Sequence, residues 1–574
     1  MILIFLSWIY IFFTTITLGI GLGKIVSIKT NGIITSIFGL ITTTILASIW
    51  AIFGRINVEF HSTLLLLNSV ITIVFFREIR DIFKIFYKDF TQLYQPFKLL
   101  FIINSIIILA QCAAPPYIID NESYYIQTIK WLNEYGLVKG LANVHIFFGQ
   151  TSGWHILQSA FNFSFLYKNF NDLSGFFLLL ATAFSFKKLN NYLTNGNKVD
   201  LCIGILMLAQ GYFLQFISAP SPDLPIYWLT FIIFYIFLKK YNKPTVEDTN
   251  LILLLVTFLL YIKPIYFTLL ILPIAFGRTL FRTTFKKTIP TVTIAFLFGV
   301  LLVVKNCLLT GYPLFPLTTF SIPKIDYAVP NHVLQYHFSR ERLYRFFITK
   351  NEFHTLTTLQ IFLKAIFFEK ISTFFYFLTF GTLIITPWSI YKFGNKKSLW
   401  ILYSVFCFQL IFLIWNAPLY RFFIHFTLLF ISINGTTFLS IKPKFITPVL
   451  GFSTLLLVIL VFIPLNLSLL THNKLLKHNA VFMSEQLLFP YKNSKENIKY
   501  KKETYGNLTF YSPVQNDFFW RTGDGDLPCV NKQQIDFFAK KLKIIPQKRS
   551  SSLADGFYSK PILENDPIRS QNIP

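Results

Sequence analysis

The sequence is poor in charged residues, and above all in acidic ones. Only 14% of its 574 residues are Asp, Glu, Lys or Arg, and Asp and Glu together number 26. A soluble domain carries roughly 25% charged residues, so this composition excludes an ordinary cytosolic protein. Intrinsic disorder is excluded as well, because 54% of the residues are hydrophobic and a disordered chain could not bury them.

Cysteine is scarce, and the motifs of common soluble enzymes are missing. The five cysteines show no spacing typical of a disulfide framework. Cys112, Cys307 and Cys529 fall at or beyond the face predicted below to be exported, where thiols can oxidise. Cys307 and Cys529 could form a disulfide bridge, but we favour the alternative that all three thiols are unpaired. The sequence has no Gly-rich phosphate loop, no His-Glu-x-x-His and no Gly-x-Ser-x-Gly motif.

Long apolar runs dominate the sequence instead. Phenylalanine alone occurs 68 times, and the mean hydropathy is +0.55. Because a spanning helix needs about 20 mostly apolar residues, we predict an all-α polytopic membrane protein with about 14 transmembrane helices. The first run has no basic start and no cleavage site, so we interpret it as a retained helix. The runs lie near 1–22, 31–53, 59–76, 99–114, 170–186, 201–218, 223–238, 249–262, 264–277, 288–305, 371–390, 398–415, 422–440 and 446–467.

The distribution of Lys and Arg predicts the orientation. These residues outnumber Asp and Glu by 52 to 26, an excess that in a soluble chain would suggest nucleic acid. Here they gather in alternate loops, such as 77–88 and 239–243, and the other short loops hold little beyond Arg55, Lys263 and Arg421. By the positive-inside rule the basic loops face the cytoplasm and the N-terminus lies outside. We therefore expect a lipid bilayer as partner and no nucleic acid.

This topology divides the chain into five parts. Residues 1–98 form N-terminal spans with a cytoplasmic basic loop, and residues 99–305 form a membrane core that includes a first exported loop at 115–169. A second exported loop covers 306–370, and C-terminal spans cover 371–467. Residues 468–574, with more turn signals and a short alternating stretch, are predicted to be a small exported α+β C-terminal appendage.

The start of the first exported loop holds the candidate catalytic residues. Pro115-Pro116 ends the preceding span, because proline cannot continue the helical hydrogen-bond ladder, and Asp120 and Glu122 follow at the membrane–water boundary. A partly desolvated carboxylate there is suited to accept a proton from a substrate hydroxyl. Asp120 could equally be only the N-cap of the next helix. Glu122 faces away from Asp120 in a helical turn and lies beside it only in an extended one, so we expect one acid to assist the other.

Residues 125–136 are predicted to form an amphipathic helix on the membrane surface. Tyr125, Ile126, Ile129 and Leu132 recur at helical spacing among polar residues, and Gly136 closes the helix.

Polar residues further along the loop are candidates for substrate binding. His145 and His155 lie in an aromatic, Gly-punctuated stretch together with Asn143. Their spacing matches no zinc motif, and each histidine could instead be a hydrogen-bonded structural residue.

Charged residues occur at the outer ends of other predicted spans. Asp223, Lys305 and Arg421 are candidate substrate-binding residues, because charges at such depth are costly and tend to be functional. Arg421 follows a proline-fixed turn and offers a fork suited to phosphate oxygens. For Lys263 we favour snorkelling toward lipid headgroups. An acid, cations and aromatic loops at one level fit a lipid phosphate that carries a sugar.

At this point the sequence resembles the GT-C superfamily of glycosyltransferases that use polyprenyl-phosphate sugars. It is also similar to a group of uncharacterised bacterial multi-spanning proteins through Asp120-Asn121-Glu122-Ser123-Tyr124-Tyr125, the run from Trp131 to His145, and Gly311-Tyr312-Pro313-Leu314-Phe315-Pro316. The resemblance implies a GT-C-like fold with Asp120 as the catalytic acid, Glu122 as the runner-up, and Arg421 meeting the donor phosphate. About three spans precede the acidic loop here, whereas in many superfamily members only one does.

The resemblance implies an enzyme of cell-envelope glycan assembly in the bacterial plasma (inner) membrane. It would move a sugar from a polyprenyl-phosphate donor to a glycan or lipid acceptor on the outer face. An O-antigen-type polymerase or ligase is an alternative supported by Arg340, Arg342 and Arg345, and a polysaccharide or lipid transporter is a third. The sequence identifies no certain cofactor, and a divalent cation such as Mg²⁺ or Mn²⁺ stays open.

Overall fold

The computed structural model describes residues 1–562 except 30, 278–284, 321, 323–324, 394–395, 439–442, 472 and 516. Each of the fourteen apolar runs coincides with helical segments. Within the described residues, eight helices are long and apolar enough to cross a membrane, or up to nine if a bent pair counts as one span. They are α1 (Ile2–Ile25), α2 (Gly32–Phe53), α5 (Gln95–Ala113), the stretch Lys198–Phe216, α14 (Phe285–Thr310), α18 (Lys370–Lys392), α19 (Lys396–Asn416) and α21 (Pro443–Phe462).

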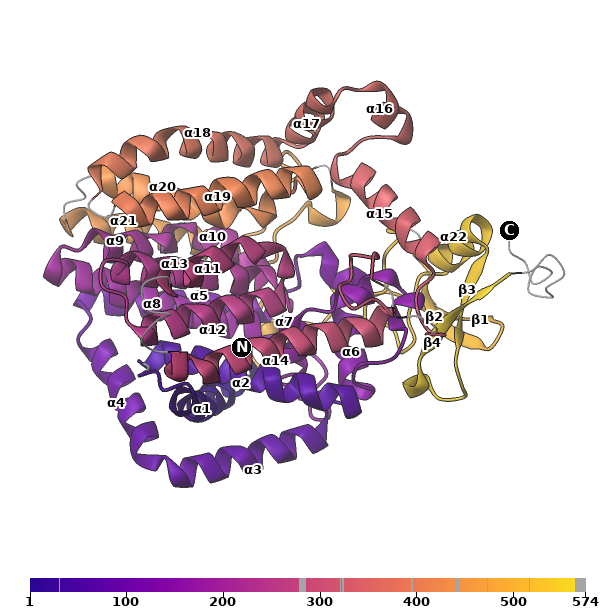
Figure 1. Ribbon diagram of the computed structural model, residues 1–574, viewed down its shortest axis with the longest axis horizontal. Helices are drawn as coiled ribbons and strands as arrows, with labels where there is room; N and C mark the ends of the chain where they lie inside the picture. Colours follow the sequence, from indigo (N-terminus) through magenta and orange to yellow (C-terminus); the bar gives the residue numbers. More distant parts are fainter. Residues whose placement is uncertain are drawn as a thin grey trace.

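The other apolar runs form helices that are shorter or less apolar. They are α3 (Val58–Val74), α8 (Leu173–Asn195), α11 (Asp223–Lys240), α12 (Val246–Ile262), η6 (Pro264–Leu270) with α13 (Ile271–Gly277), and α20 (Ile424–Phe438). Many of the helices, among them α12, α14, α18 and α19, run along the long axis of the molecule, and the β-strands lie beyond one end of them (Figure 1).

The first departure from a plain helical bundle is a sharp bend after α3. The next helix, α4 (Phe76–Thr91), turns away from α3 by 91° (Figure 1). Ile79 and Ile82 of α4 are buried against Ile16 and Ile20 of α1, and the basic side chains of α4 are exposed. An apolar face on the protein with charges opposite is typical of a helix that lies along a surface.

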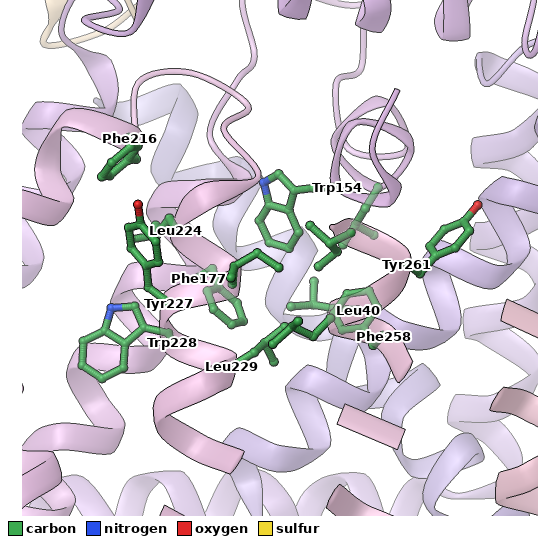
Figure 2. Close-up of a cluster of buried hydrophobic side chains, with 14 of the residues drawn as sticks. Leu40, Trp154, Phe177, Phe216, Leu224, Tyr227, Trp228, Leu229, Phe258 and Tyr261 are labelled. Atoms are coloured by element: carbon green, nitrogen blue, oxygen red, sulfur yellow. The ribbon is translucent and has the colours of Figure 1, made fainter. Parts of the chain in front are cut away.

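The centre of the bundle is a large aromatic and aliphatic core around α11. Every residue of α11 from Asp223 to Leu238 is buried, as expected of a helix that is apolar on all sides. Figure 2 shows Leu224, Tyr227 and Trp228 of this helix in the same cluster of buried side chains as Trp154, whose indole nitrogen donates to the Ser174 hydroxyl at 3.1 Å. The hydroxyl of Tyr227 points toward the Phe216 side of the cluster, away from Leu229 (Figure 2).

The long loop between α5 and α8 begins as predicted. After Ala113 and the two prolines, a π-helical turn, η1 (Asn121–Tyr125), leads into α6 (Ile126–Glu134). Gly136 closes α6 with a φ of +78°, and a Cβ there would lie 2.3 Å from the Gly54 carbonyl oxygen. The remaining elements of the loop are η2 (Leu141–Asn143), η3 (Ile146–Gln150) and α7 (Gly153–Ser159).

The prediction that this helix lies on the membrane surface is wrong. All residues of α6 from Ile126 to Asn133 except Lys130 are buried. The polar face that was expected to meet water is covered by the C-terminal part of the chain, where the side-chain amide of Gln127 donates to the carbonyls of Gly523 and Gly525 at 3.0 and 2.8 Å.

Residues 468–562, called the tail from here on, fold into a small α+β unit, as predicted. Strands β1 (Tyr500–Tyr505) and β2 (Leu508–Pro513) form an antiparallel hairpin. Helix α22 (Lys532–Leu542) precedes a second antiparallel pair, β3 (Ile544–Lys548) with β4 (Phe557–Pro561). The last twelve residues of the predicted appendage, 563–574, lie outside the described residues.

The segment between α14 and α18 is helical as well. It contains α15 (Asn331–Arg345), α16 (Lys350–Thr355) and α17 (Thr358–Phe367). All five cysteines are free, so Cys307 and Cys529 form no bridge, and the favoured alternative of unpaired thiols is confirmed.

Candidate functional site

The centre of the candidate site is an ion pair between Asp120 and Arg421. Nη1 of Arg421 lies 2.8 Å from Oδ2 of Asp120, although the two residues are 301 positions apart in the sequence. The Asp120 side chain keeps 26% of its surface accessible and the Arg421 side chain 33%, so the pair is neither fully buried nor free in solvent. The structure thus brings together the predicted catalytic acid and the predicted phosphate-binding cation.

Asp120 does not act as a helix cap. It occupies the N-cap position of η1, but its side chain makes no capping hydrogen bond. Its carboxylate turns instead toward Arg421, with the Tyr125 hydroxyl at a longer 3.5 Å. The capping alternative is therefore wrong. Single π-helical turns are frequent at functional sites, and this one directs the backbone after Asp120 into the protein.

The turn that carries Arg421 is held by tyrosines from three different elements. The Tyr227 hydroxyl of α11 donates to the Arg421 carbonyl at 2.5 Å, and the Tyr266 hydroxyl of η6 donates to the Phe422 carbonyl at 2.9 Å. Tyr376 of α18 donates to the Pro418 carbonyl at 2.6 Å. Because a short 3₁₀ turn, η7 (Tyr420–Phe422), makes few bonds of its own, these hydroxyls fix the position from which Arg421 extends.

A second ion pair lies next to the first. Nζ of Lys263 contacts Oδ1 of Asp223, whose side chain is only 1% exposed. Lys263 also lies over the Phe422 ring, 4.8 Å from its centre. The expectation that Lys263 snorkels toward lipid headgroups is therefore wrong, because its ammonium group is held inside the protein by a carboxylate.

The two ion pairs form one electrostatic cluster of two acids and two bases. Lys263 lies within the electrostatic reach of Arg421 and Asp120 as well as of its partner Asp223. Two polar atoms of the cluster, Nε of Arg421 and Oδ2 of Asp223, are buried and have no hydrogen-bond partner among the residues that the structure describes. Each of these atoms can form a hydrogen bond with a polar ligand or a water molecule.

Glu122 lies away from this cluster. Its carboxylate is 6% exposed and accepts hydrogen bonds from the Ser494 hydroxyl at 2.7 Å and the Lys495 amide at 2.8 Å. Its carbonyl accepts two more from the amides of Thr522 and Gly523, both at 2.9 Å. Burial raises the pKa of Glu122 above its usual range, against the effect of these donors. The structure places this residue in the contact with the tail.

His155 and Lys305 are buried beside the cluster. Nδ1 of His155 accepts from the Ser152 amide at 3.2 Å and so caps α7, while Nε2 is buried without a partner. Burial, with the nearby charges of Lys305 and Lys263, lowers the pKa of His155 to about 3, so its ring is neutral. The Lys305 ammonium donates to the Thr151 carbonyl just before α7.

His145 and Asn143 make structural contacts with residues outside the ion pairs. The His145 ring lies among Phe147, Phe148 and Trp520, and burial lowers its pKa to about 3. Asn143 donates to the Gly140 and Tyr327 carbonyls and accepts from the Ser559 hydroxyl. In both cases a tail residue completes the contacts, as it does for Glu122.

Sequence reasoning missed the tyrosines and His425. The His425 ring is fully buried between Tyr227 and Tyr266, with ring centres 4.9 and 5.3 Å away, and both of its nitrogens lack a partner. A tyrosine or histidine in an apolar run carries no signal that distinguishes a site residue from a core residue.

The arrangement of potential metal ligands can be compared with the needs of a metal site. Among the residues the structure describes, no group of three or more His, Cys, Asp or Glu side chains is placed to hold a metal ion. Asp120 and Asp223 are the carboxylates at the cluster, and each is already paired with a cation.

The fold is that of a helical membrane protein. Its candidate site is a cluster of acidic and basic side chains where the loop between α5 and α8, η6 and the turn η7 meet. The chain belongs to the family described as a domain of unknown function, DUF8201, whose family model matches residues 1–428. That range includes both ion pairs, and the tail lies beyond it. No curated protein and no solved structure matches the chain.

Proposed function

We propose that the protein is a membrane glycosyltransferase that moves a sugar from a polyprenyl-phosphate donor to a glycan or lipid acceptor. The single observation that carries this proposal is the Asp120–Arg421 pair at 2.8 Å. It joins an acid able to take a proton with a guanidinium able to hold a phosphate, and the chain assembles it from two distant loops.

The chemistry assigns one task to each member of the pair. A lone pair of the acceptor hydroxyl attacks the anomeric carbon of the donor, and the bond from that carbon to the phosphate oxygen breaks. Asp120 takes the hydroxyl proton, and the phosphate leaves with the bonding electrons and is stabilised by Arg421.

The proposal includes the finer topology. In it, all fourteen apolar runs cross the plasma membrane of a bacterium, with the N-terminus and the tail on the outer side. Two contacts support placing these two ends on one side: the N-terminal amine donates to the Gln486 carbonyl at 2.5 Å, and the Ile2 amide to the Leu487 carbonyl at 2.9 Å.

The decisive experiment replaces Asp120 by Asn and measures sugar transfer by the purified protein from a panel of polyprenyl-phosphate sugars. A general base contributes about 10²- to 10⁴-fold to a rate, so we expect transfer to fall by at least about 100-fold. Asp326→Asn is the matched control, because it removes the same charge from an exposed pair with Arg549 near the tail. Undiminished transfer by folded Asp120→Asn protein would remove Asp120 from the mechanism.

One contact keeps a polymerase or ligase of O-antigen type as a second candidate. Arg345 of α15 donates to the Asn416 carbonyl at 3.3 Å, at the start of the loop that carries Arg421. Arginines in late loops are what that reaction class would require. Transfer of a whole glycan rather than a single sugar would favour this alternative.

A further inference from the structure

Arg421 is already occupied by a carboxylate when no ligand is bound. Asp120 contacts Nη1 of the guanidinium, and the buried Nε has no partner within the described part of the chain. A guanidinium can bind two oxygens of one anion through parallel hydrogen bonds. The pair therefore uses one of the donors that a phosphate would need and leaves another unsatisfied.

Of the two partners, Asp120 is the one that can move. The Tyr227 hydroxyl holds the Arg421 backbone and the Tyr266 hydroxyl holds that of the next residue, so the guanidinium extends from a fixed point. The carboxylate of Asp120 is different: in the described part of the chain it has only Arg421 and the long Tyr125 contact. A competing anion would thus displace the carboxylate rather than the arginine.

Neighbouring cations do not offer Asp120 an equal alternative. Lys263 is engaged by Asp223, a residue with 1% exposure, and Lys305 donates to the Thr151 carbonyl. A carboxylate that leaves Arg421 becomes an ionised acceptor without a strong partner. Such a group is a better base than one held in an ion pair, because it has lost the guanidinium that stabilised its charge most directly.

We propose that Asp120 is a built-in competitor for the phosphate site at Arg421, so that binding of a phosphate ester displaces the carboxylate and thereby frees it to act as the base. The inference rests on the proposed function for the phosphate at Arg421. It adds an order of events: the acid is released only when the anion is in place. The ligand class is a phosphate group, either on a lipid or free.

The test is the affinity of the purified full-length protein for dodecyl phosphate in detergent micelles, measured for wild type and Asp120→Asn. A hydrogen bond between charged groups changes an equilibrium constant by about ten- to 100-fold. Because both side chains are partly accessible, we take the lower end and expect Asp120→Asn to bind about tenfold more tightly. The control Asp326→Asn should bind as wild type does, since its charge lies outside the site.

Two further arms identify the ligand. Dodecanol, which has the chain but no charge, should show no difference between wild type and Asp120→Asn. Inorganic phosphate tests the headgroup alone: tightening with both phosphates assigns the site to any phosphate, and tightening with dodecyl phosphate only assigns it to a lipid. Arg421→Gln should abolish the gain when combined with Asp120→Asn, with melting temperatures of all variants to verify folding.

Equal or weaker binding of dodecyl phosphate by folded Asp120→Asn protein would overturn the inference, as would a gain that survives Arg421→Gln. This outcome is independent of sugar transfer. Tightened binding together with no transfer from any donor would retain the masked phosphate site and reject the glycosyltransferase proposal.

Discussion

Glu122 provides a sharp test of whether the second acid of the loop serves structure or chemistry. Glu122→Ala would leave the Lys495 amide, now bonded at 2.8 Å, without its acceptor, whereas the Ser494 hydroxyl would keep its contact with the Glu496 carbonyl at 3.1 Å. An unsatisfied buried group costs about 1–3 kcal/mol, so docking of the tail should weaken by about that amount. Glu122→Gln keeps one acceptor oxygen and should cost about half as much.

The assay is limited proteolysis of the full-length protein in detergent, following release of the tail. Trypsin has exposed sites in the tail at Lys499, Lys501 and Lys502. We expect much faster cleavage in Glu122→Ala and intermediate cleavage in Glu122→Gln. Glu485→Ala, an exposed glutamate of the same tail, is the matched control and should behave as wild type.

The pH dependence gives a second readout. Because burial raises the pKa of Glu122 above its ordinary value of 4.5, the docked state holds the proton more tightly than the undocked state. Docking should therefore be strongest near and below pH 4.5 and weaken as the pH rises through the raised pKa. Glu122→Gln cannot titrate and should lack this dependence. The reasoning is refuted if Glu122→Ala is cleaved like wild type, or if Glu122→Gln loses transfer with its tail still docked.

Three other predictions concern the supports of the site. Tyr266→Phe removes the donor to the Phe422 carbonyl, so the free energy of unfolding should fall by about 1 kcal/mol, measured as a lower melting temperature. Dodecyl phosphate should bind severalfold more weakly to this variant. Unchanged binding would show that the Tyr266 hydroxyl does not position the turn. Lys263→Met leaves Asp223 buried and unpaired, which should cost about 3–5 kcal/mol in thermal unfolding, and added Asp223→Asn should recover part of it. Gly136→Ala places a Cβ against the Gly54 carbonyl at a left-handed backbone position, so the free energy of unfolding should fall by about 2 kcal/mol or more in the same denaturation assay. Gly54→Ala is the control: a Cβ there meets open space, and the stability should hardly change.

Local sequence signals predicted the helices well, because each depends on residues close in the chain. The proline pair after α5 and the glycine at 136 end helices for reasons of backbone geometry alone. The 91° bend at Phe75 was not predictable, since neither Pro nor Gly occurs there. The burial of α6 was missed because its cover comes from Gly523 and Gly525, nearly 400 positions away.

In the candidate site, too, local signals were predictable and long-range contacts were not. Asp120 was predicted from its place after the proline pair at the membrane–water boundary, and Arg421 from the high cost of a charge at the end of a span. The structure pairs the two residues. The prediction for Lys263 was wrong because a lysine at the end of a span gives the same sequence signal in two situations. Its ammonium group can meet lipid headgroups or, as here, a carboxylate 40 positions earlier. His145 and His155 accept from backbone amides through Nδ1, a capping role for which the sequence gives no distinctive signal. The catalytic and substrate roles of the residues stay predictions.

The contact between the tail and Glu122 has a consequence for how the protein matures. Two residues after Asp120, the backbone and side chain of Glu122 are bonded to segments that the ribosome makes more than 370 residues later. A chain released early by a premature stop codon near residue 480 would still contain both members of the ion pair but none of this clamp. The loop that carries Asp120 would then be clamped only after the last part of the chain has been synthesised and folded onto it.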